Sequence, residues 1–108
     1  MSADLPKPIA DYFAAANACD TRNLHDYFAE DAVVQDEREE RRGVAAIRNW
    51  MKDTGEKYAA VAEVTTVVLQ ADDIVVAAKV TGNFPGSPAT LHYTFRLRND
   101  RIVHLEIH

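Results

Sequence analysis

The chain has 108 residues, of which 47% are hydrophobic and 27% are charged, so its composition is that of a globular protein rather than a disordered one. At this length we expect one hydrophobic core, and therefore a single domain over residues 1–108. Twelve basic residues against seventeen acidic ones give a net charge of −5, which disfavours nucleic acids and anionic lipid surfaces as partners.

The cellular location is predicted from cysteine usage and from the distribution of apolar residues. Cys19 is the only cysteine, so an intramolecular disulfide is excluded. The N-terminal residues lack the basic and apolar stretches of a secretory leader. No apolar run reaches the roughly 18 residues that are needed to cross a bilayer. We therefore expect a cytoplasmic protein that is not embedded in a membrane.

The first third of the chain has the residue spacing of amphipathic helices. Pro8 suits a first helical turn, and it precedes apolar residues at three-and-four spacing: Ile9, Tyr12, Phe13 and Ala16. This pattern predicts a helix over residues 8–20. Asp20 or Thr21 can cap a second short helix with three apolar residues on one side: Leu24, Tyr27 and Phe28.

A third helix is expected after a short strand and a charged loop. Residues 32–35 predict the strand, and residues 36–42, in which Glu37 and its neighbours alternate with arginines, predict a solvated loop that ends at Gly43. The next segment has one largely apolar face, made of Val44, Ile47, Trp50, Met51 and Thr54. We expect this helix to end at Gly55.

The rest of the chain is rich in β-branched residues and predicts four strands, at residues 60–70, 74–82, 89–98 and 101–108. The connections are short, and Asn99-Asp100 suits a two-residue hairpin, so neighbouring strands should be antiparallel. Along the third of these strands the alternate residues expected to face the helices are Leu91, Tyr93, Phe95 and Leu97. The fold class predicted is α+β, with three N-terminal helices on one face of a meandering sheet.

Three segments show a family resemblance. They are YFAAANACD at residues 12–20, FAEDAVVQD at residues 28–36 and RGVAAIR at residues 42–48. In order and spacing they resemble the SnoaL-like branch of the NTF2-like (cone-fold) superfamily, and most closely the ketosteroid-isomerase-like proteins. The resemblance covers essentially the whole chain. It implies a curved, mostly antiparallel sheet wrapped over three helices, an apolar pocket between them, and a homodimer through the outer sheet face.

The same resemblance assigns three candidate catalytic residues. Tyr12 matches the phenolic hydrogen-bond donor of ketosteroid isomerases, and Asp36 matches their general base. Tyr93 falls where those enzymes have a protonated aspartate, a departure that disfavours steroid-sized substrates. From the residues alone, Tyr12 could equally be a tyrosine whose ring packs in the core. Asp36 could equally be a turn or cap residue at the start of the charged loop.

Several more side chains are candidates for the pocket wall. They are Tyr27, Trp50, Met51, Tyr58, Phe84, Phe95 and His104. Aromatic residues at helical spacing are more often core than ligand cage, so only some of these should contact a ligand.

His104, Glu106 and His108 share one strand face. Residues two apart on a strand are separated by about 6.6 Å, which is too far for one metal coordination sphere. We predict a polar outer or interface face here and no metal site. His104 would reach the pocket only if a bulge inverted the strand's parity.

Three functions stay open on the sequence. The first is acid–base catalysis of the isomerase or cyclase type on a small carbonyl-bearing molecule, with Asp36 as base. The second is a non-catalytic module that binds a small apolar molecule. The third is a dimerisation scaffold. No cofactor is expected, because we find no phosphate-binding loop, no metal-ligand spacing and no nucleophile with a nearby base.

Overall fold

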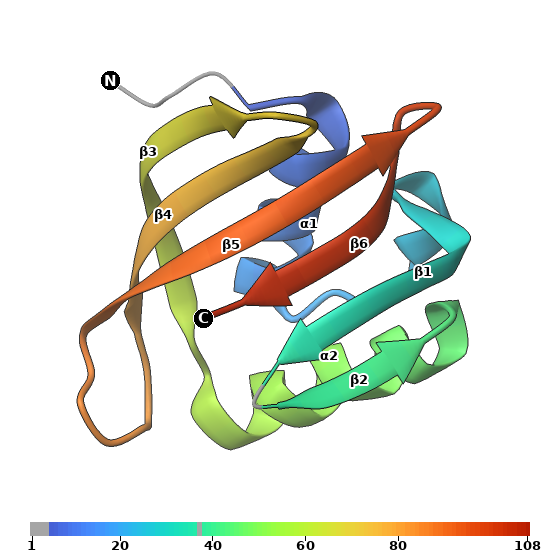
Figure 1. The fold of residues 1–108 in the computed structure, drawn as a ribbon. Coiled ribbons are helices and arrows are strands. Elements are labelled where there is room, and N and C mark those ends of the chain that lie inside the picture. Colours follow the sequence, from blue (N-terminus) through green and yellow to red (C-terminus); the bar gives the residue numbers. More distant parts are fainter. Residues whose placement is uncertain (1–4, 37) are drawn as a thin grey trace.

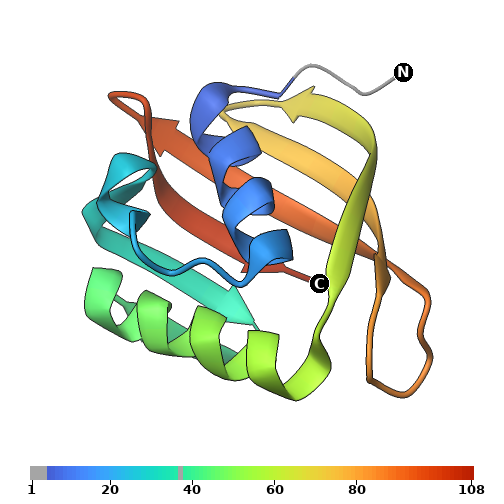
Figure 2. The ribbon, with the colours of Figure 1, turned by 180° about the vertical axis from the view of Figure 1, so that it is seen from behind.

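Two helices lie against one face of a six-stranded sheet in the computed structural model, which describes residues 5–36 and 38–108 (Figures 1 and 2). Glu37 and residues 1–4 lie outside the described part. The elements are α1 (Lys7–Ala18), the 3₁₀ turn η1 (Leu24–Asp26), β1 (Phe28–Asp36), β2 (Glu39–Arg42), α2 (Val44–Tyr58), β3 (Val61–Gln70), β4 (Asp73–Thr81), β5 (Ala89–Arg98) and β6 (Arg101–Ile107).

The sheet confirms the predicted α+β class and its mostly antiparallel character. The strand order is β2-β1-β6-β5-β4-β3, and only the β1–β6 pair is parallel. β5 and β6 are joined through Asn99 and Asp100, whose φ angles are 53° and 59°. Positive φ at both turn residues is the geometry of a two-residue hairpin turn, as the sequence predicted.

The prediction of three helices was wrong, because the second helix is only the three-residue turn η1. Leu24 is buried, but Tyr27 already lies outside the turn and Phe28 begins β1. The main-chain oxygen of Tyr27 accepts a hydrogen bond from the Ile102 amide at 2.7 Å, and Phe28 is in register with Ile102. Pairing with the distant strand β6 therefore replaces the local helical bonds that the spacing suggested.

The predicted charged loop and the predicted end of the third helix also need correction. Part of the loop forms β2, which pairs antiparallel with β1. Two acidic residues are followed by two basic ones in β2, and residues two apart form the Arg41–Glu39 and Arg42–Glu40 ion pairs at 3.1 and 2.9 Å. Helix α2 continues three residues past Gly55 and ends at Tyr58, where the C-cap Ala59 has a left-handed backbone with φ 47°.

The sheet bends around the helices, and irregular strand pairing accompanies the bend (Figures 1 and 2). Register shifts occur within β3, between Val64 and Thr66, and in the β5–β6 pair, between Arg96 and Leu97. A register shift of this kind leaves one strand with an extra residue, and such a bulge increases the local twist of the strand. The concave side that results holds the core and faces α1 and α2.

An aromatic cluster fills the centre of this concave side. Its members are Tyr12, Phe13, Phe28, Tyr93 and Phe95, which meet mostly edge to face with ring centres 5.0–6.4 Å apart. Edge-to-face pairs add to the stabilisation that burial provides. No helix in the described residues is long and apolar enough to cross a membrane.

Gly82 marks a close approach between the end of β4 and the segment after α2. A Cβ at this position would lie 2.7 Å from the main-chain oxygen of Tyr58 and 2.9 Å from the Cα of Ala60. We expect Gly82→Ala to destabilise the fold by about 1–3 kcal/mol, because main chain would have to move. Urea unfolding measures the loss. The neighbouring exposed change Thr81→Ala should stay within about 0.5 kcal/mol, and equal losses in both variants would contradict this explanation.

Candidate functional site

A cavity of about 460 Å³ opens between the two helices and the concave face of the sheet. This volume is within the roughly 300–1,000 Å³ range of small-molecule sites. Its walls come from α1, α2, the ends of β1, β4 and β6, the start of β3, the first half of β5 and the loop that carries Phe84. His108, which was expected on the outer face, is among the lining residues. Most of the lining is apolar or aromatic, and among the described residues Asp36 is the only acidic side chain in it.

The cavity brings together the three candidate catalytic residues from three different elements. Tyr12 comes from the buried face of α1, Tyr93 from the inward side of β5, and Asp36 from the last position of β1. Both tyrosines are almost fully buried, whereas Asp36 is half-buried. The phenols of Tyr12 and Tyr93 and the carboxylate of Asp36 therefore share a largely apolar cavity, which Tyr58 also lines.

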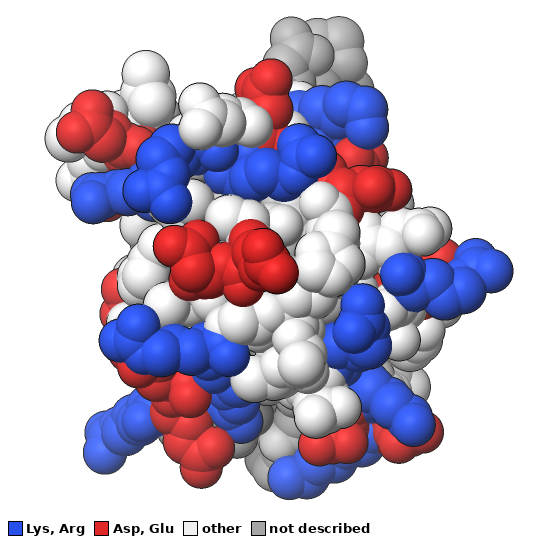
Figure 3. All heavy atoms as spheres, turned by 90° about the vertical axis from the view of Figure 1, so that its right-hand side faces the viewer, with Lys and Arg blue, Asp and Glu red and all other residues white. Residues whose placement is uncertain are grey.

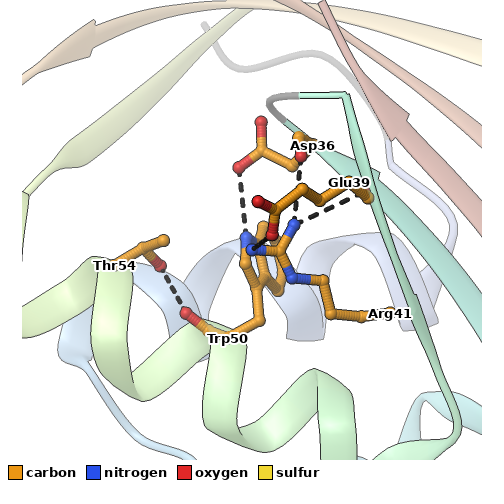
Figure 4. Close-up of polar contacts among 5 residues, drawn as sticks. All are labelled: Asp36, Glu39, Arg41, Trp50 and Thr54. Carbon is orange, nitrogen blue, oxygen red and sulfur yellow. Dashed lines mark hydrogen bonds and ion pairs between the residues drawn. The ribbon is translucent and has the colours of Figure 1, made fainter.

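A hydrogen bond between Asp36 and Trp50 fixes the carboxylate (Figure 4). Trp50 Nε1 donates to Asp36 Oδ2 at 3.1 Å, across a sequence separation of 14 residues. The Trp50 ring lies on the buried face of α2. A buried indole N–H requires an acceptor, and here the acceptor is a carboxylate of the candidate site. From the sequence, Trp50 was expected only as part of the cavity wall.

Arg41 holds the main chain at the same position. Its Nη1 donates to the main-chain oxygen of Asp36 at 3.0 Å, and its Nη2 forms an ion pair with Glu39 at 3.1 Å (Figure 4). The guanidinium side chain is 24% exposed. Arg41 thus ties the end of β1 to the start of β2, where sequence analysis had expected a solvated loop.

Burial and charge keep both phenols protonated. Burial raises the pKa of Tyr12 well above its usual value, and the neighbouring Tyr93 and Asp36 charges act in the same direction. Burial, followed by the charge of Asp36, raises the pKa of Tyr93 to about 12. At neutral pH both groups are therefore hydrogen-bond donors.

The other predicted wall residues divide into two groups. Trp50, Met51, Tyr58 and Phe84 line the cavity, and Tyr27, Phe95 and His104 do not. Phe95 is fully buried in the aromatic cluster, and Tyr27 lies beside a separate hollow next to Asp20. His104 lies on the outer face, in register with the exposed Arg96. The strand irregularity falls before it, between Ile102 and His104, and does not turn it toward the cavity.

The cavity mouth has features that sequence analysis missed. The Asn17 side chain exchanges two hydrogen bonds with the main chain of Ala62, at 3.0 and 2.8 Å, and so joins the end of α1 to the edge strand β3. Tyr58 and Phe84 meet edge to face at 6.1 Å. Asn17 gave no signal in the sequence, because an asparagine near a helix end has many ordinary uses. Within the described residues, no group of three metal-ligating side chains could hold an ion.

Comparison with solved structures gives the class of fold. An NTF2-like protein of unknown function from Cytophaga hutchinsonii has a TM-score of 0.77 and 14% identity, covering 100% of this chain and 93% of that one. A protein with a ketosteroid-isomerase-like fold from Catenulispora acidiphila, solved in complex with trimethylamine, has a TM-score of 0.82 and 19% identity, covering 97% and 86%. The fold is therefore NTF2-like, with two helices rather than the three predicted.

The family is given by sequence similarity. The SnoaL-like domain model matches residues 9–105, and the chain belongs to the SnoaL-like family. A Sinorhizobium meliloti protein, provisionally named a polyketide cyclase, is 43% identical with a TM-score of 0.92, covering 97% of this chain and 96% of that one. A search of curated protein sequences found no significant match.

Proposed function

We propose that this protein binds a small carbonyl-bearing molecule in the cavity and moves a proton on it without a cofactor. In this proposal Asp36 removes a proton from the carbon next to the carbonyl. Tyr12 and Tyr93 donate hydrogen bonds to the carbonyl oxygen as negative charge develops on it. The observation that carries the proposal is the shared cavity, which brings the carboxylate of Asp36 and the protonated phenols of Tyr12 and Tyr93 into one mostly apolar lining.

The chemistry of the lining supports this reaction class. A carboxylate at the wall of a mostly apolar cavity can act as a general base on a proton next to a carbonyl. Neutral phenols can stabilise a carbonyl oxygen that becomes anionic, because each donates a hydrogen bond to it. At neutral pH the phenols stay protonated, so they do not take the proton that Asp36 removes from the ligand. The similarity to a protein provisionally named a polyketide cyclase agrees with a carbonyl-bearing ligand, and the trimethylamine complex of the Catenulispora protein agrees with a small one.

Hydrogen–deuterium exchange tests the reaction without knowledge of the product. A panel of small cyclic ketones is incubated with the protein in deuterium oxide, and loss of the C–H signal next to the carbonyl is followed by NMR. We expect exchange faster than in protein-free buffer and saturable in ketone concentration. Thermal shifts on the same panel report binding, since ligand at about 100 times its dissociation constant stabilises by about 2.7 kcal/mol.

A non-catalytic binding module is the alternative, and the same pair of measurements separates the two. Binding of a ketone by thermal shift, with exchange no faster than in buffer, would overturn the acid–base proposal in favour of the binding module. Tyr93 is the observation that favours the binding module. At this position the ketosteroid isomerases that the sequence resembles have a protonated aspartate.

Tyr12→Phe is expected to slow exchange about tenfold, because one neutral hydrogen bond of roughly 1–1.5 kcal/mol is lost while Tyr93 still donates. The exchange rate of a saturating ketone measures the effect. Tyr27→Phe is the matched control, since it removes a buried phenol that lies outside the cavity. Equal slowing by both variants would show that the hydroxyl of Tyr12 has no special role.

We propose in addition that two copies associate through the outer sheet face. This face carries half-buried or exposed valines between polar rows, with Val68 55% exposed and an Arg96–Asp73 ion pair at 3.0 Å. Around the edge formed by β1, β2 and α2, basic and acidic side chains are interspersed, so that side offers no single-sign patch (Figure 3). Sedimentation is expected to show a dimer at micromolar concentration, and a monomer alone would remove this proposal.

A further inference from the structure

The indole of Trp50 is fixed before any ligand arrives. It projects from the buried face of α2, and only 6% of the residue is exposed. The main-chain oxygen of Trp50 accepts a hydrogen bond from the Thr54 hydroxyl at 2.8 Å (Figure 4). A ring that is buried to this degree has little rotational freedom, so its N–H is a donor with a set direction.

That donor reaches only one of the two oxygens of Asp36. Nε1 donates to Oδ2, and the other carboxylate oxygen points away from the indole in Figure 4. A hydrogen bond to the charged form of a carboxyl favours that form, and it opposes the effect of burial in an apolar chamber. The bond therefore acts on both the orientation and the protonation of the group.

We propose that Trp50 is a positioning residue, which holds the carboxylate of Asp36 in one orientation for proton transfer from the ligand. The inference rests on the proposed function in one respect, namely that Asp36 is the group that reacts. It adds that α2, through a single indole N–H, determines the strength and the geometry of the base. Trp50 acts through Asp36 and takes no part in proton transfer itself.

Other groups also face Asp36 and must stay constant in any test. From β2, Arg41 donates to the Asp36 main chain and pairs with Glu39. From α1 and β5, the phenols of Tyr12 and Tyr93 lie close enough to interact with the carboxylate charge. A replacement that removes only the indole N–H leaves all of these groups in place.

The first experiment uses the fact that the chain has one tryptophan. Protein labelled with ¹⁵N at the indole gives a single side-chain N–H signal, which is followed over about pH 3 to 8, the range that spans carboxyl titration. We expect this signal to move with one midpoint in the wild type and to be insensitive to pH in Asp36→Asn. A signal that titrates equally in both proteins would overturn the proposal.

The second experiment replaces the N–H by sulfur. A tryptophan auxotroph supplied with benzothienylalanine changes only residue 50, and the ring keeps its size. The ¹³C carboxyl signal of Asp36 should then titrate with its midpoint about one pH unit higher, since the charged form has lost a donor. The acid limb of the exchange rate against pH should move by the same amount, while ketone binding at neutral pH changes little.

A packing control and a second variant keep the outcome interpretable. Ile47→Val loosens the same helix at a fully buried position that does not line the cavity, and it should leave the midpoint of Asp36 in place. Trp50→Phe should shift the midpoint in the same direction as the sulfur analogue. An unmoved midpoint in both Trp50 replacements would refute the positioning role. A moved midpoint in a protein that exchanges no ketone would retain the positioning role and reject the acid–base function.

Discussion

Replacing Asp36 with asparagine is expected to slow deuterium exchange of a bound ketone by at least about 100-fold, because a positioned general base contributes about 10²–10⁴ in rate. Asparagine has nearly the same size, and its amide oxygen can still accept the hydrogen bond from Trp50 Nε1. The fold and the cavity should therefore persist while the group that takes the proton is lost. The rate is measured by NMR at saturating ketone, and thermal shift confirms that the ketone still binds.

Asp31→Asn is the control for this substitution. Asp31 lies on the same strand, β1, but its side chain is 79% exposed and its ion pair with Arg98 is long, at 3.8 Å. The substitution Asp31→Asn removes the same charge outside the cavity, so deuterium exchange of the ketone should keep its wild-type rate. An Asp36→Asn protein that exchanges as fast as Asp31→Asn would exclude Asp36 as the base.

The second large effect is on stability. Phe95→Ala should lower the free energy of unfolding by about 3–5 kcal/mol, as large-to-small changes at fully buried aromatic residues do. Phe95 is 0% exposed, and its ring contacts those of Tyr12, Phe13 and Tyr93 at 5.7–6.3 Å between centres. Total stability at this size is roughly 5–15 kcal/mol, so the variant would lose much of it.

Urea unfolding measures this loss, with an unchanged dependence on urea concentration as the sign that two-state behaviour persists. Leu69→Ala serves as the control, because this leucine is 75% exposed at the edge strand β3 and should change stability by less than about 0.5 kcal/mol. A loss below about 1 kcal/mol for Phe95→Ala would mean that the aromatic cluster does not support the concave face.

The sequence by itself determined the long strands and the two long helices. Alternation along residues 89–98 is a local property, since side chains on a strand point to opposite faces whatever lies beyond them. Asn99 and Asp100 determined their turn for a similar reason, because both residue types tolerate positive φ. The family resemblance rested on such local patterns and extended over nearly the whole chain.

Tertiary structure decided the short elements. The spacing of Leu24, Tyr27 and Phe28 suited a helix, but isolated helices of this length are marginal, and pairing with β6 contributed more. Similarly, residues 39–42 have the charge pattern of a loop, and they became a strand because β1 offered an unpaired edge. Gly55 did not end α2, because a glycine inside a helix costs only about 1 kcal/mol, which packing outweighs.

The site shows the same division. The resemblance pointed to Asp36, Tyr12 and Tyr93, and the structure places all three at one cavity. The sequence could not separate Trp50, which lines the cavity, from Phe95, which does not, because both are simply large apolar residues on an inward face. Nor could it indicate the bond from Trp50 to Asp36, which exists only because α2 packs across the end of β1. Local chemistry determined which groups were available, and the curvature of the sheet decided which of them meet.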